Sequence, residues 1–356
     1  MLECKQSGAV AMAGPAAAGG SLMHQLTIGK LRGLMEISDE RGIIAVTALD
    51  HRGSLKESLE KAFGRPVGYD DVVREKLRMV RVFAPHSSAV LLDPIYGAAQ
   101  AVACGAVPGR VGLLVAVEES GYEGAEGGRV TRLVEGWSVA KIKRMGASAV
   151  KMLLYYHPQS PTAHQQEQLV ARVAEECRQQ DIPFLLEPMS YPIEAGQRKS
   201  SPEFAREKPR IVLESVRRLG RLGVDLLKLE FPDDPHFEKD EARMREHCRQ
   251  ITRESPVPWV ILSAAETFEV FQRLVEIACE EGASGFMVGR AIWQEAMRMP
   301  DERDRDRFLN TIAVSRLEIL RAVASRRGRS WHEAARGPQV TEGWHARYPE
   351  ADHAEA

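Results

Sequence analysis

The chain has little that would direct it to a membrane, to nucleic acid or to the outside of the cell. No apolar run approaches the roughly 18–20 residues that span a bilayer, and the formal net charge of −2 provides no basic footprint for nucleic acid. The five cysteines are scattered without a CxxC pair, which is typical of reduced thiols in a cytoplasmic protein rather than of a disulfide framework. Neither a membrane nor a nucleic acid is therefore expected as a partner.

The two ends of the chain differ in composition from its middle. Residues 1–28 are rich in Ala and Gly, but glycines and a proline interrupt the apolar run that a signal peptide needs. We interpret residues 1–28 as a flexible extension, with Met23 as a candidate for the native start. Residues 331–356 are polar and are expected to form a loosely packed tail. The folded domain is expected to cover residues 29–330.

Eight short apolar runs recur along the middle of the chain, with amphipathic segments between them. Runs rich in Val, Ile and Leu that lack clean alternation suit the strands of a parallel sheet covered by helices. The runs are Ile43–Leu49, Ala89–Asp93, Gly112–Val117, Ala149–Tyr155, Pro183–Glu187, Asp225–Phe231, Pro258–Ser263 and Ser284–Gly289. The clearest amphipathic segments are Trp137–Met145, Thr162–Gln179, Lys208–Leu222, Asp240–Glu254 and Glu266–Glu281.

Eight repeats of strand and helix in about 300 residues predict an α/β fold with a single (β/α)8, or TIM, barrel. The alternative is an open, doubly wound parallel sheet. That fold is typically marked by a GxGxxG turn after its first strand, and the segment Asp50–Ser54 has no such turn. In a barrel, catalytic side chains come from the C-terminal ends of the strands, so we expect the chemistry there.

Lys228 is the most informative single residue, because it lies in the middle of the apolar run Val224–Phe231. Lysine is rarely buried unless it is paired or used, and burial lowers the proton affinity of an amine, as a Schiff-base nucleophile requires. Strand alternation places Lys228 with Leu226 and Glu230 on the face toward the barrel interior. The alternative is a structural ion pair of Lys228 with Glu187 or Glu230.

Other strand ends supply charged groups close to Lys228. Asp50 ends the first run, Lys151 lies in the fourth and Glu187 ends the fifth. Two lysines that both point into the barrel are expected to lower each other's proton affinity, and burial adds to this effect. We therefore expect Lys228, Glu187, Asp50 and Lys151 to form the catalytic group.

A second group, at the ends of the seventh and eighth runs, is suited to an anion. Ser263 ends one run and Gly289-Arg290 follow the other, and this part of a barrel often builds a phosphate site. Gly289 allows the backbone to approach the anion, and Arg290 adds a fork of donors. Expected helix N-termini at Ala265 and Ala291 would offer free N–H groups. The alternative is that Ser263 caps a helix and Arg290 pairs with a surface acid.

No metal or other cofactor is expected. The histidines His51 and His157 are candidates for a divalent site. Asp93 or Glu119 could join them there, but the sequence has no HxH or HExxH spacing.

Eight segments share their order and spacing with a known family. They are Ala48–Gly53, Leu92–Pro94, Trp137–Val139, Ala149–Tyr156, Leu186–Pro188, Phe204–Pro209, Val224–Lys228 and Gly289–Ala291. Together they resemble the tagatose 1,6-bisphosphate aldolase family, whose members are class I, Schiff-base aldolases built as (β/α)8 barrels. That family includes aldolases that cleave 6-deoxy-6-sulfofructose 1-phosphate. The resemblance runs from about residue 30 to about residue 330.

The resemblance implies roles for the catalytic group. Lys228 matches the Schiff-base lysine of the family, and Glu187 matches its acid/base glutamate. Asp50 and Lys151 match the aspartate and lysine that class I aldolases place beside the imine.

The resemblance also implies a substrate-binding group. Ser263 and Arg290 match phosphate-binding positions, and Gly289 and Arg52 complete the expected set. One departure is His51, which stands where the family has glutamine in an aspartate-glutamine-arginine motif. This departure bears on substrate choice and leaves the imine chemistry intact.

The expected activity is that of a metal-independent class I aldolase. It would cleave a phosphorylated ketohexose similar to tagatose 1,6-bisphosphate into dihydroxyacetone phosphate and an aldehyde. One alternative is cleavage of 6-deoxy-6-sulfofructose 1-phosphate to dihydroxyacetone phosphate and sulfolactaldehyde, and another is metal-assisted hydrolysis. Outside enzymes, the alternative is a barrel that senses sugar phosphates without turnover. The expected partner is the small phosphorylated sugar, and self-association into a homo-oligomer is left open.

Overall fold

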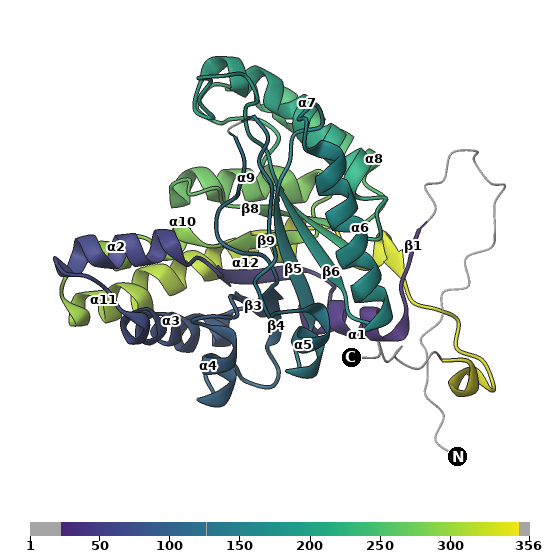
Figure 1. Cartoon of the computed structure of the whole chain (residues 1–356), viewed down its shortest axis with the longest axis horizontal. Helices are drawn as coiled ribbons and strands as arrows, with labels where there is room; N and C mark the ends of the chain where they lie inside the picture. The colour runs from purple at the N-terminus through teal and green to yellow at the C-terminus, as the bar shows by residue number, and fades with distance from the viewer. Residues whose placement is uncertain (1–22, 126, 349–356) are drawn as a thin grey trace.

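The computed structural model describes residues 23–125 and 127–348, and eight parallel strands in it form a closed barrel (Figure 1). The barrel closes because β2 pairs with both β3 and β9. The predicted TIM barrel is therefore confirmed. Its strands are β2 (Ile44–Leu49), β3 (Ala89–Leu92), β4 (Gly112–Ala116), β5 (Ala149–Tyr155), β6 (Phe184–Met189), β7 (Leu226–Leu229), β8 (Trp259–Leu262) and β9 (Gly285–Val288).

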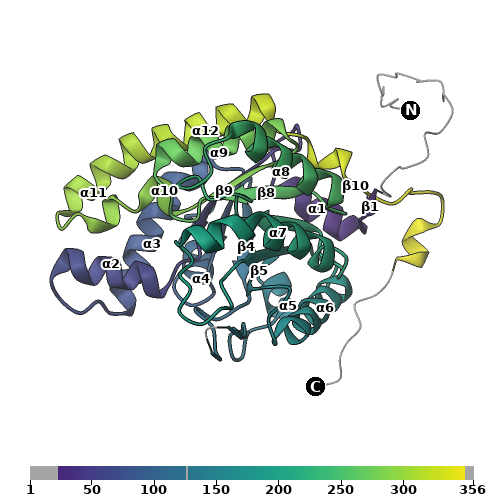
Figure 2. The ribbon, with the colours of Figure 1, turned by 90° about the horizontal axis from the view of Figure 1, so that it is seen from above.

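Helices surround the barrel on its outside, as the view in Figure 2 shows. The α-helices are α1 (Ile28–Glu36), α2 (Gly53–Phe63), α3 (Tyr69–Phe83), α4 (Ala98–Ala103), α5 (Val139–Arg144), α6 (Ala163–Gln179), α7 (Pro202–Leu219), α8 (Glu241–Glu254), α9 (Phe268–Glu280), α10 (Arg290–Trp293), α11 (Glu302–Phe308) and α12 (Val314–Arg327). Short 3-10 helices are η1 (Ala84–His86), η2 (Ala296–Arg298), η4 (Trp331–Glu333) and η5 (Trp344–Arg347), and η3 (Leu309–Ala313) is a π-helix. None of the helices in the described part of the chain has the length and apolar character to cross a membrane.

The predicted strands and helices are present, with small differences at their ends. No strand end differs from its predicted position by more than two residues. The largest helix error is at α7, which begins at Pro202 and not at Lys208. Ser201 caps this helix, because its Oγ accepts a hydrogen bond from the Phe204 N–H at 3.2 Å. Pro209, which by itself is typical of a helix start, lies inside α7.

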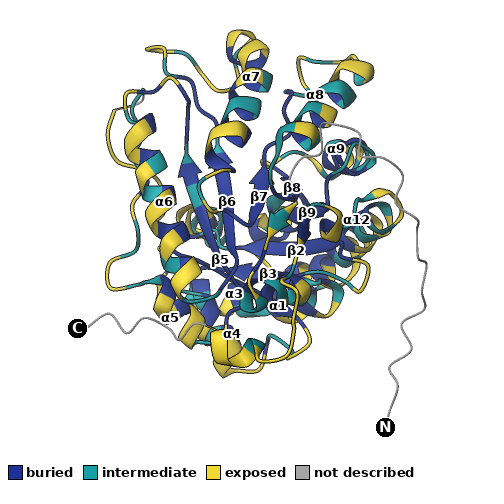
Figure 3. Cartoon of the chain, turned by 90° about the vertical axis from the view of Figure 1, so that its right-hand side faces the viewer, coloured by how far each residue is buried: buried dark blue, intermediate teal, exposed yellow. Residues whose placement is uncertain are grey.

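Strand alternation divides the apolar core into two layers. One cluster fills the barrel interior, and the other packs between the strands and the helices, whose outer faces are exposed (Figure 3). In β7, Leu226 belongs to the interior cluster, whereas Leu227 and Leu229 belong to the helix-facing cluster. Lys228 therefore points into the barrel, as the alternation predicts.

Segments from both ends of the chain pack together under the barrel. Strand β1 (His24–Gln25) pairs in parallel with β10 (Ala335–Arg336). Trp331 is fully buried in the interior cluster, and its Nε1 donates to Ser38 Oγ at 3.0 Å. The predicted boundaries at residues 28 and 331 therefore fall inside a packed layer of the fold. The sequence does not reveal this layer, because the burial of a few terminal apolar residues leaves no periodic pattern. Residues 1–22 and 349–356 of the predicted extension and tail lie outside the described residues.

Asp225 connects this lower layer to the strand that carries Lys228. Its carboxylate lies 2.8 Å from Lys30 Nζ and 2.9 Å from His24 Nε2, and it accepts the Phe184 N–H at 2.9 Å. Asp225 is 1% exposed, so these contacts compensate a buried charge. The N-terminal segment is thus bound to the start of β7.

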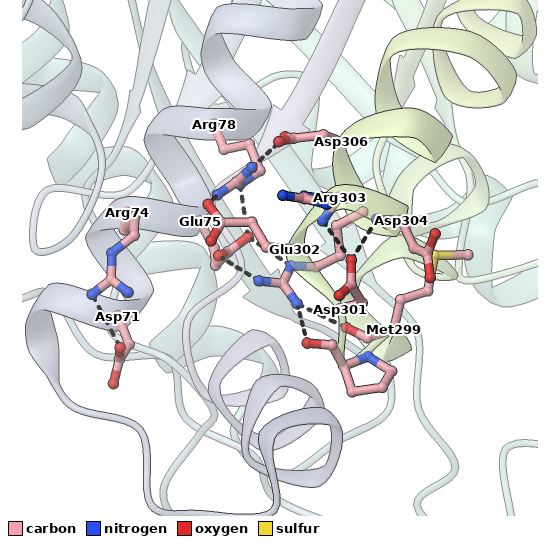
Figure 4. Close-up of polar contacts among 12 residues, drawn as sticks. Asp71, Arg74, Glu75, Arg78, Met299, Asp301, Glu302, Arg303, Asp304 and Asp306 are labelled. Atoms are coloured by element: carbon pink, nitrogen blue, oxygen red, sulfur yellow. Dashed lines mark hydrogen bonds and ion pairs between the residues drawn. The ribbon is translucent and has the colours of Figure 1, made fainter.

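A network of charged side chains joins α3 to α11 on another side of the barrel (Figure 4). Arg78 on α3 pairs with both Glu302 and Asp306 on α11. Arg305, which is buried, lies 3.2 Å from Glu75 of α3. The C-terminal helices are held to the barrel partly through these pairs.

We expect Trp331→Ala to lower the free energy of unfolding by about 3–5 kcal/mol, because it removes a fully buried ring from the base of the barrel. Trp344→Ala is the matched control, since Trp344 packs against Tyr348 in the tail outside the core clusters, and its cost should stay below about 1 kcal/mol. Urea unfolding of both variants measures the difference. Equal stabilities would show that the C-terminal segment is not part of the folded domain.

Candidate active site

A hollow of about 520 Å³ opens at the C-terminal ends of the barrel strands. Its size and position are typical of a small-molecule site in a TIM barrel. All eight predicted site residues line it: Asp50, Arg52, Lys151, Glu187, Lys228, Ser263, Gly289 and Arg290.

Lys228 and Glu187 form a close pair at the wall of this hollow. The Lys228 Nζ lies 2.9 Å from Oε2 of Glu187, and their side chains are only 5% and 8% exposed. The ion pair that was the alternative to a catalytic role is thus present. Both groups line the hollow, however, so the amine is accessible to a small ligand.

Three carboxylates surround the amine of Lys151. Its Nζ lies 2.7 Å from Asp50, 2.6 Å from Glu118 and 3.0 Å from Glu187. Burial opposes the charge of Lys151, but the three carboxylates outweigh burial and hold its pKa well above the usual value. The prediction that two interior lysines lower each other's proton affinity is therefore wrong for Lys151, because it did not count the acids around this amine.

Asp50 stays ionised beside these amines. Burial by itself raises the pKa of a carboxyl group, but the charges of Lys151 and Lys228 reverse this effect and hold the pKa of Asp50 well below its usual range. Asp50 also accepts a hydrogen bond from Lys151 at 2.7 Å. Lys151 contacts Oδ2, so Oδ1 of the carboxylate remains available as a proton acceptor.

His51 is a neutral ring at the edge of the site. Burial lowers its pKa to about 3, and the opposing charge of Asp50, whose Oδ1 lies 3.7 Å from Nδ1, does not restore it. The ring packs edge-on against Trp293, with centroids 5.2 Å apart. A Cβ atom at position 289 would lie 2.9 Å from Cε1 of His51, so the ring requires Gly289 beside it.

The other candidate metal ligands lie apart from one another. The His157 Nδ1 accepts the Gln159 N–H at 3.1 Å, and Asp93 pairs with the buried Lys76 at 2.5 Å. Within residues 23–125 and 127–348, no three His, Cys, Asp or Glu side chains are grouped as a metal ion would require.

The predicted anion-binding group is assembled at the ends of β8 and β9. The Gly289 N–H donates to Ser263 Oγ at 3.4 Å. Arg290 follows as the first residue of α10, one residue before the predicted start, and burial lowers the pKa of its guanidinium. No described carboxylate lies within ion-pair distance of Arg290, so its donors are free for an anion.

The turn after Ser263 differs from its prediction. Ala264 and Ala265 have φ values of 46° and 66°, in the left-handed region that residues other than glycine rarely adopt. Helix α9 begins only at Phe268, with Thr267 as its N-cap. The predicted helix N-terminus at Ala265 is therefore wrong, and so is the alternative that Ser263 is the cap. Two adjacent strained residues on the wall of a hollow are typical of a binding site.

Arg52 connects two walls of the site. Its Nη2 donates to the backbone carbonyl oxygen of Glu118, so the end of β2 is held to the end of β4. Arg52 is largely buried, at 9% exposed. It therefore has a structural contact besides its expected role toward the substrate.

Sequence reasoning gave no role to Glu118, which the structure places in the centre of the site. Its Oε1 contacts Lys151, and its Oε2 is buried with no hydrogen-bond partner among the described residues. The sequence has two adjacent acids after β4, Glu118 and Glu119. Strand alternation would have assigned one of them to the interior, but their position just beyond the strand end left the choice open.

Comparisons with known proteins agree with this geometry. The profile of the DeoC/LacD family aldolases matches residues 44–295. A tagatose 1,6-diphosphate aldolase of Listeria monocytogenes serotype 4a is 35% identical over 305 residues, which cover 80% of this chain and 87% of that protein. Tagatose 1,6-diphosphate aldolase 2 of Enterococcus faecalis is 32% identical over 341 residues, covering 90% and 100%.

A solved structure has a similar fold. It is an archaeal fructose-1,6-bisphosphate aldolase with its catalytic lysine covalently bound to the carbinolamine intermediate. The TM-score is 0.51 at 22% identity, over 81% of this chain and 98% of that one. This similarity supports the barrel fold, and the sequence matches decide the family. The chain therefore belongs to the DeoC/LacD family of aldolases.

Proposed function

We propose that this aldolase forms a Schiff base through Lys228 and cleaves a phosphorylated ketohexose similar to tagatose 1,6-bisphosphate. The products would be dihydroxyacetone phosphate and an aldehyde. The observation that carries the proposal is the Lys228 amine, which lines the hollow 2.9 Å from Glu187 and near the donors of Ser263, Gly289 and Arg290. The relatives named tagatose 1,6-diphosphate aldolase support this substrate class.

The first half of the reaction forms the imine. The neutral Lys228 amine attacks the C2 carbonyl and gives a carbinolamine. Glu187, which lies beside the amine, passes the proton that the attacking nitrogen loses to the C2 oxygen, and then delivers a second proton, taken up from water, to the hydroxyl so that water departs. The iminium that results is an electron sink next to C3.

The second half breaks the carbon–carbon bond. A carboxylate, Glu187 or Asp50, removes the proton of the C4 hydroxyl, the C3–C4 bond breaks, and its electrons form an enamine while the aldehyde leaves. Protonation of the enamine at C3 and hydrolysis of the imine then release dihydroxyacetone phosphate and restore the Lys228 amine. Through both halves, Ser263, Gly289 and Arg290 would hold the C1 phosphate.

Lys151 would act by charge and position. Its ammonium contacts Asp50, Glu118 and Glu187, and would therefore hold the three carboxyl groups in place around the reacting carbons. Cleavage of 6-deoxy-6-sulfofructose 1-phosphate would use the same steps, since both substrates carry a C1 phosphate, a C2 ketone and a C4 hydroxyl and differ in the configuration at C4 and in the anion at C6.

Incubation with dihydroxyacetone phosphate and borohydride should reduce the imine to a stable adduct on Lys228. Lys228→Ala should lose the adduct, and Lys228→Arg should lose it too because a guanidinium stays protonated. Lys239→Ala is the control, since this exposed lysine only contacts the Pro235 carbonyl. Peptide mass mapping locates the adduct, and parallel assays with EDTA should show full turnover. An adduct on another lysine would refute the assignment, and binding without any adduct would favour the sensing barrel.

The pH dependence of kcat/KM should contain no ionisation of His51. Burial holds its pKa at about 3, so the ring is neutral from about pH 5 to pH 8 and does not change charge there. His51→Gln should therefore change KM while leaving the shape of the profile as in the wild type. A limb near pH 6.5 that disappears in the variant would show instead that His51 titrates during turnover.

A further inference from the structure

Arg129 has surroundings that the proposed reaction does not explain. It lies in the loop between β4 and α5, and its guanidinium carbon is 4.3 Å from the ring centroid of Tyr122, 4.6 Å from that of Tyr191 and 5.5 Å from that of Tyr155. Three aromatic rings around one guanidinium stabilise its charge and fix its plane. Such stacking leaves the N–H edges of the group available for hydrogen bonds.

Among the described residues, Arg129 has no acidic partner. No carboxylate of residues 23–125 and 127–348 lies within ion-pair distance of it, and its Nε is buried without a hydrogen-bond partner there. Two cations of the neighbouring loops are paired, because Lys199 lies 2.5 Å from Glu230, and His236 lies 3.1 Å from Glu266. A fixed and unneutralised guanidinium is the group that proteins most often use for phosphate and similar anions.

The backbone of Arg129 is held in place. Its N–H donates to Tyr191 Oη at 3.3 Å, and its carbonyl oxygen accepts from Thr162 Oγ1 at 3.1 Å. A bridge between Glu123 and Val130 closes the same loop. The guanidinium is therefore presented by a supported loop, as a binding site requires.

The position of Arg129 relative to the imine fits the far end of a hexose. Tyr155, which its guanidinium contacts, ends β5 and lines the active-site hollow. In the closed strand order, β5 lies four places from β9, which is the opposite side of the barrel from Gly289-Arg290. A sugar whose C1 phosphate lies at Arg290 and whose C2 is bonded to Lys228 would thus extend its C6 end toward Tyr155 and Arg129.

Arg129 also lines a second hollow, beside the active-site hollow. It has a volume of about 650 Å³, is lined by Arg129, Lys199 and Lys208, and shares Ala264 with the active-site hollow. Four acids also line this hollow. Glu230 and Glu266 are paired with Lys199 and His236, and the other two are Glu194 and Asp234. The hollow is therefore polar and of mixed charge. Within it, Arg129 is the cation whose guanidinium is stacked on tyrosine rings.

We propose that Arg129 binds the terminal anion at C6 of the substrate, a phosphate or a sulfonate, and so selects ketohexoses that are charged at both ends. This inference rests on the proposed function, since it assumes the sugar is bonded to Lys228 at C2. It assigns the discrimination between doubly and singly charged substrates to the loop after β4. Tyr122, Tyr155 and Tyr191 act as the support that orients the guanidinium.

The test compares three substrates: tagatose 1,6-bisphosphate, 6-deoxy-6-sulfofructose 1-phosphate and tagatose 1-phosphate. Arg129→Gln should lower kcat/KM at least tenfold for the substrate whose C6 anion the site binds, and change it less than twofold for tagatose 1-phosphate. Arg129→Lys should recover part of the loss. Arg132→Gln is the matched control, because this arginine lies in the same loop and pairs with Glu123. It should leave all three values unchanged.

The pattern of losses identifies the anion and the role. A larger loss for the bisphosphate than for the sulfo sugar indicates phosphate, and the reverse indicates sulfonate. An equal loss on all three substrates, or no loss on any, would overturn the proposal. Borohydride trapping with dihydroxyacetone phosphate separates this outcome from failure of the proposed function: an intact Lys228 adduct in Arg129→Gln with an unselective loss refutes only the subsite, whereas no adduct in the wild type refutes the imine and the subsite together.

Discussion

The contact of one buried ammonium with three carboxylates is the interaction on which the site depends. Without the Lys151 charge, Asp50, Glu118 and Glu187 would bring like charges together in a barrel interior, which costs far more than a surface pair. With it, the three acids are held around one amine, and Glu187 also contacts the amine of Lys228. In the proposed mechanism the two lysines therefore have different tasks, because Lys151 stays a cation and Lys228 reacts with the substrate.

The barrel supplies this arrangement through the alternation of its strands. Lys151 in β5, Glu187 in β6 and Lys228 in β7 all point inward, because their apolar neighbours in each strand fill the layer under the helices. Asp225 strengthens the same strand from below, where it joins β7 to the N-terminal segment. Chemistry at one end of β7 is therefore supported by a buried ion pair at the other.

Much of this could be predicted from the sequence, because period-two and helical patterns are local. The eight strands, the inward direction of Lys228 and the gathering of Asp50, Lys151 and Glu187 near it follow from such patterns. What depends on contacts between distant residues could not be predicted. The high pKa of Lys151 requires three acids from other strands, the left-handed turn at Ala264 leaves no trace in residue type, and Trp331 lies in a polar segment although it is fully buried.

The central claim is that Lys228 exchanges the C2 oxygen of the substrate for its own nitrogen. It is tested most directly by incubating the protein in ordinary water with dihydroxyacetone phosphate that carries oxygen-18 at C2, and by following the mass of the recovered ketone. Each cycle of imine formation and hydrolysis replaces that oxygen with one from water. The account predicts rapid loss of label with the wild type and only the spontaneous rate with Lys228→Ala. Retention of the label by the wild-type protein would contradict it.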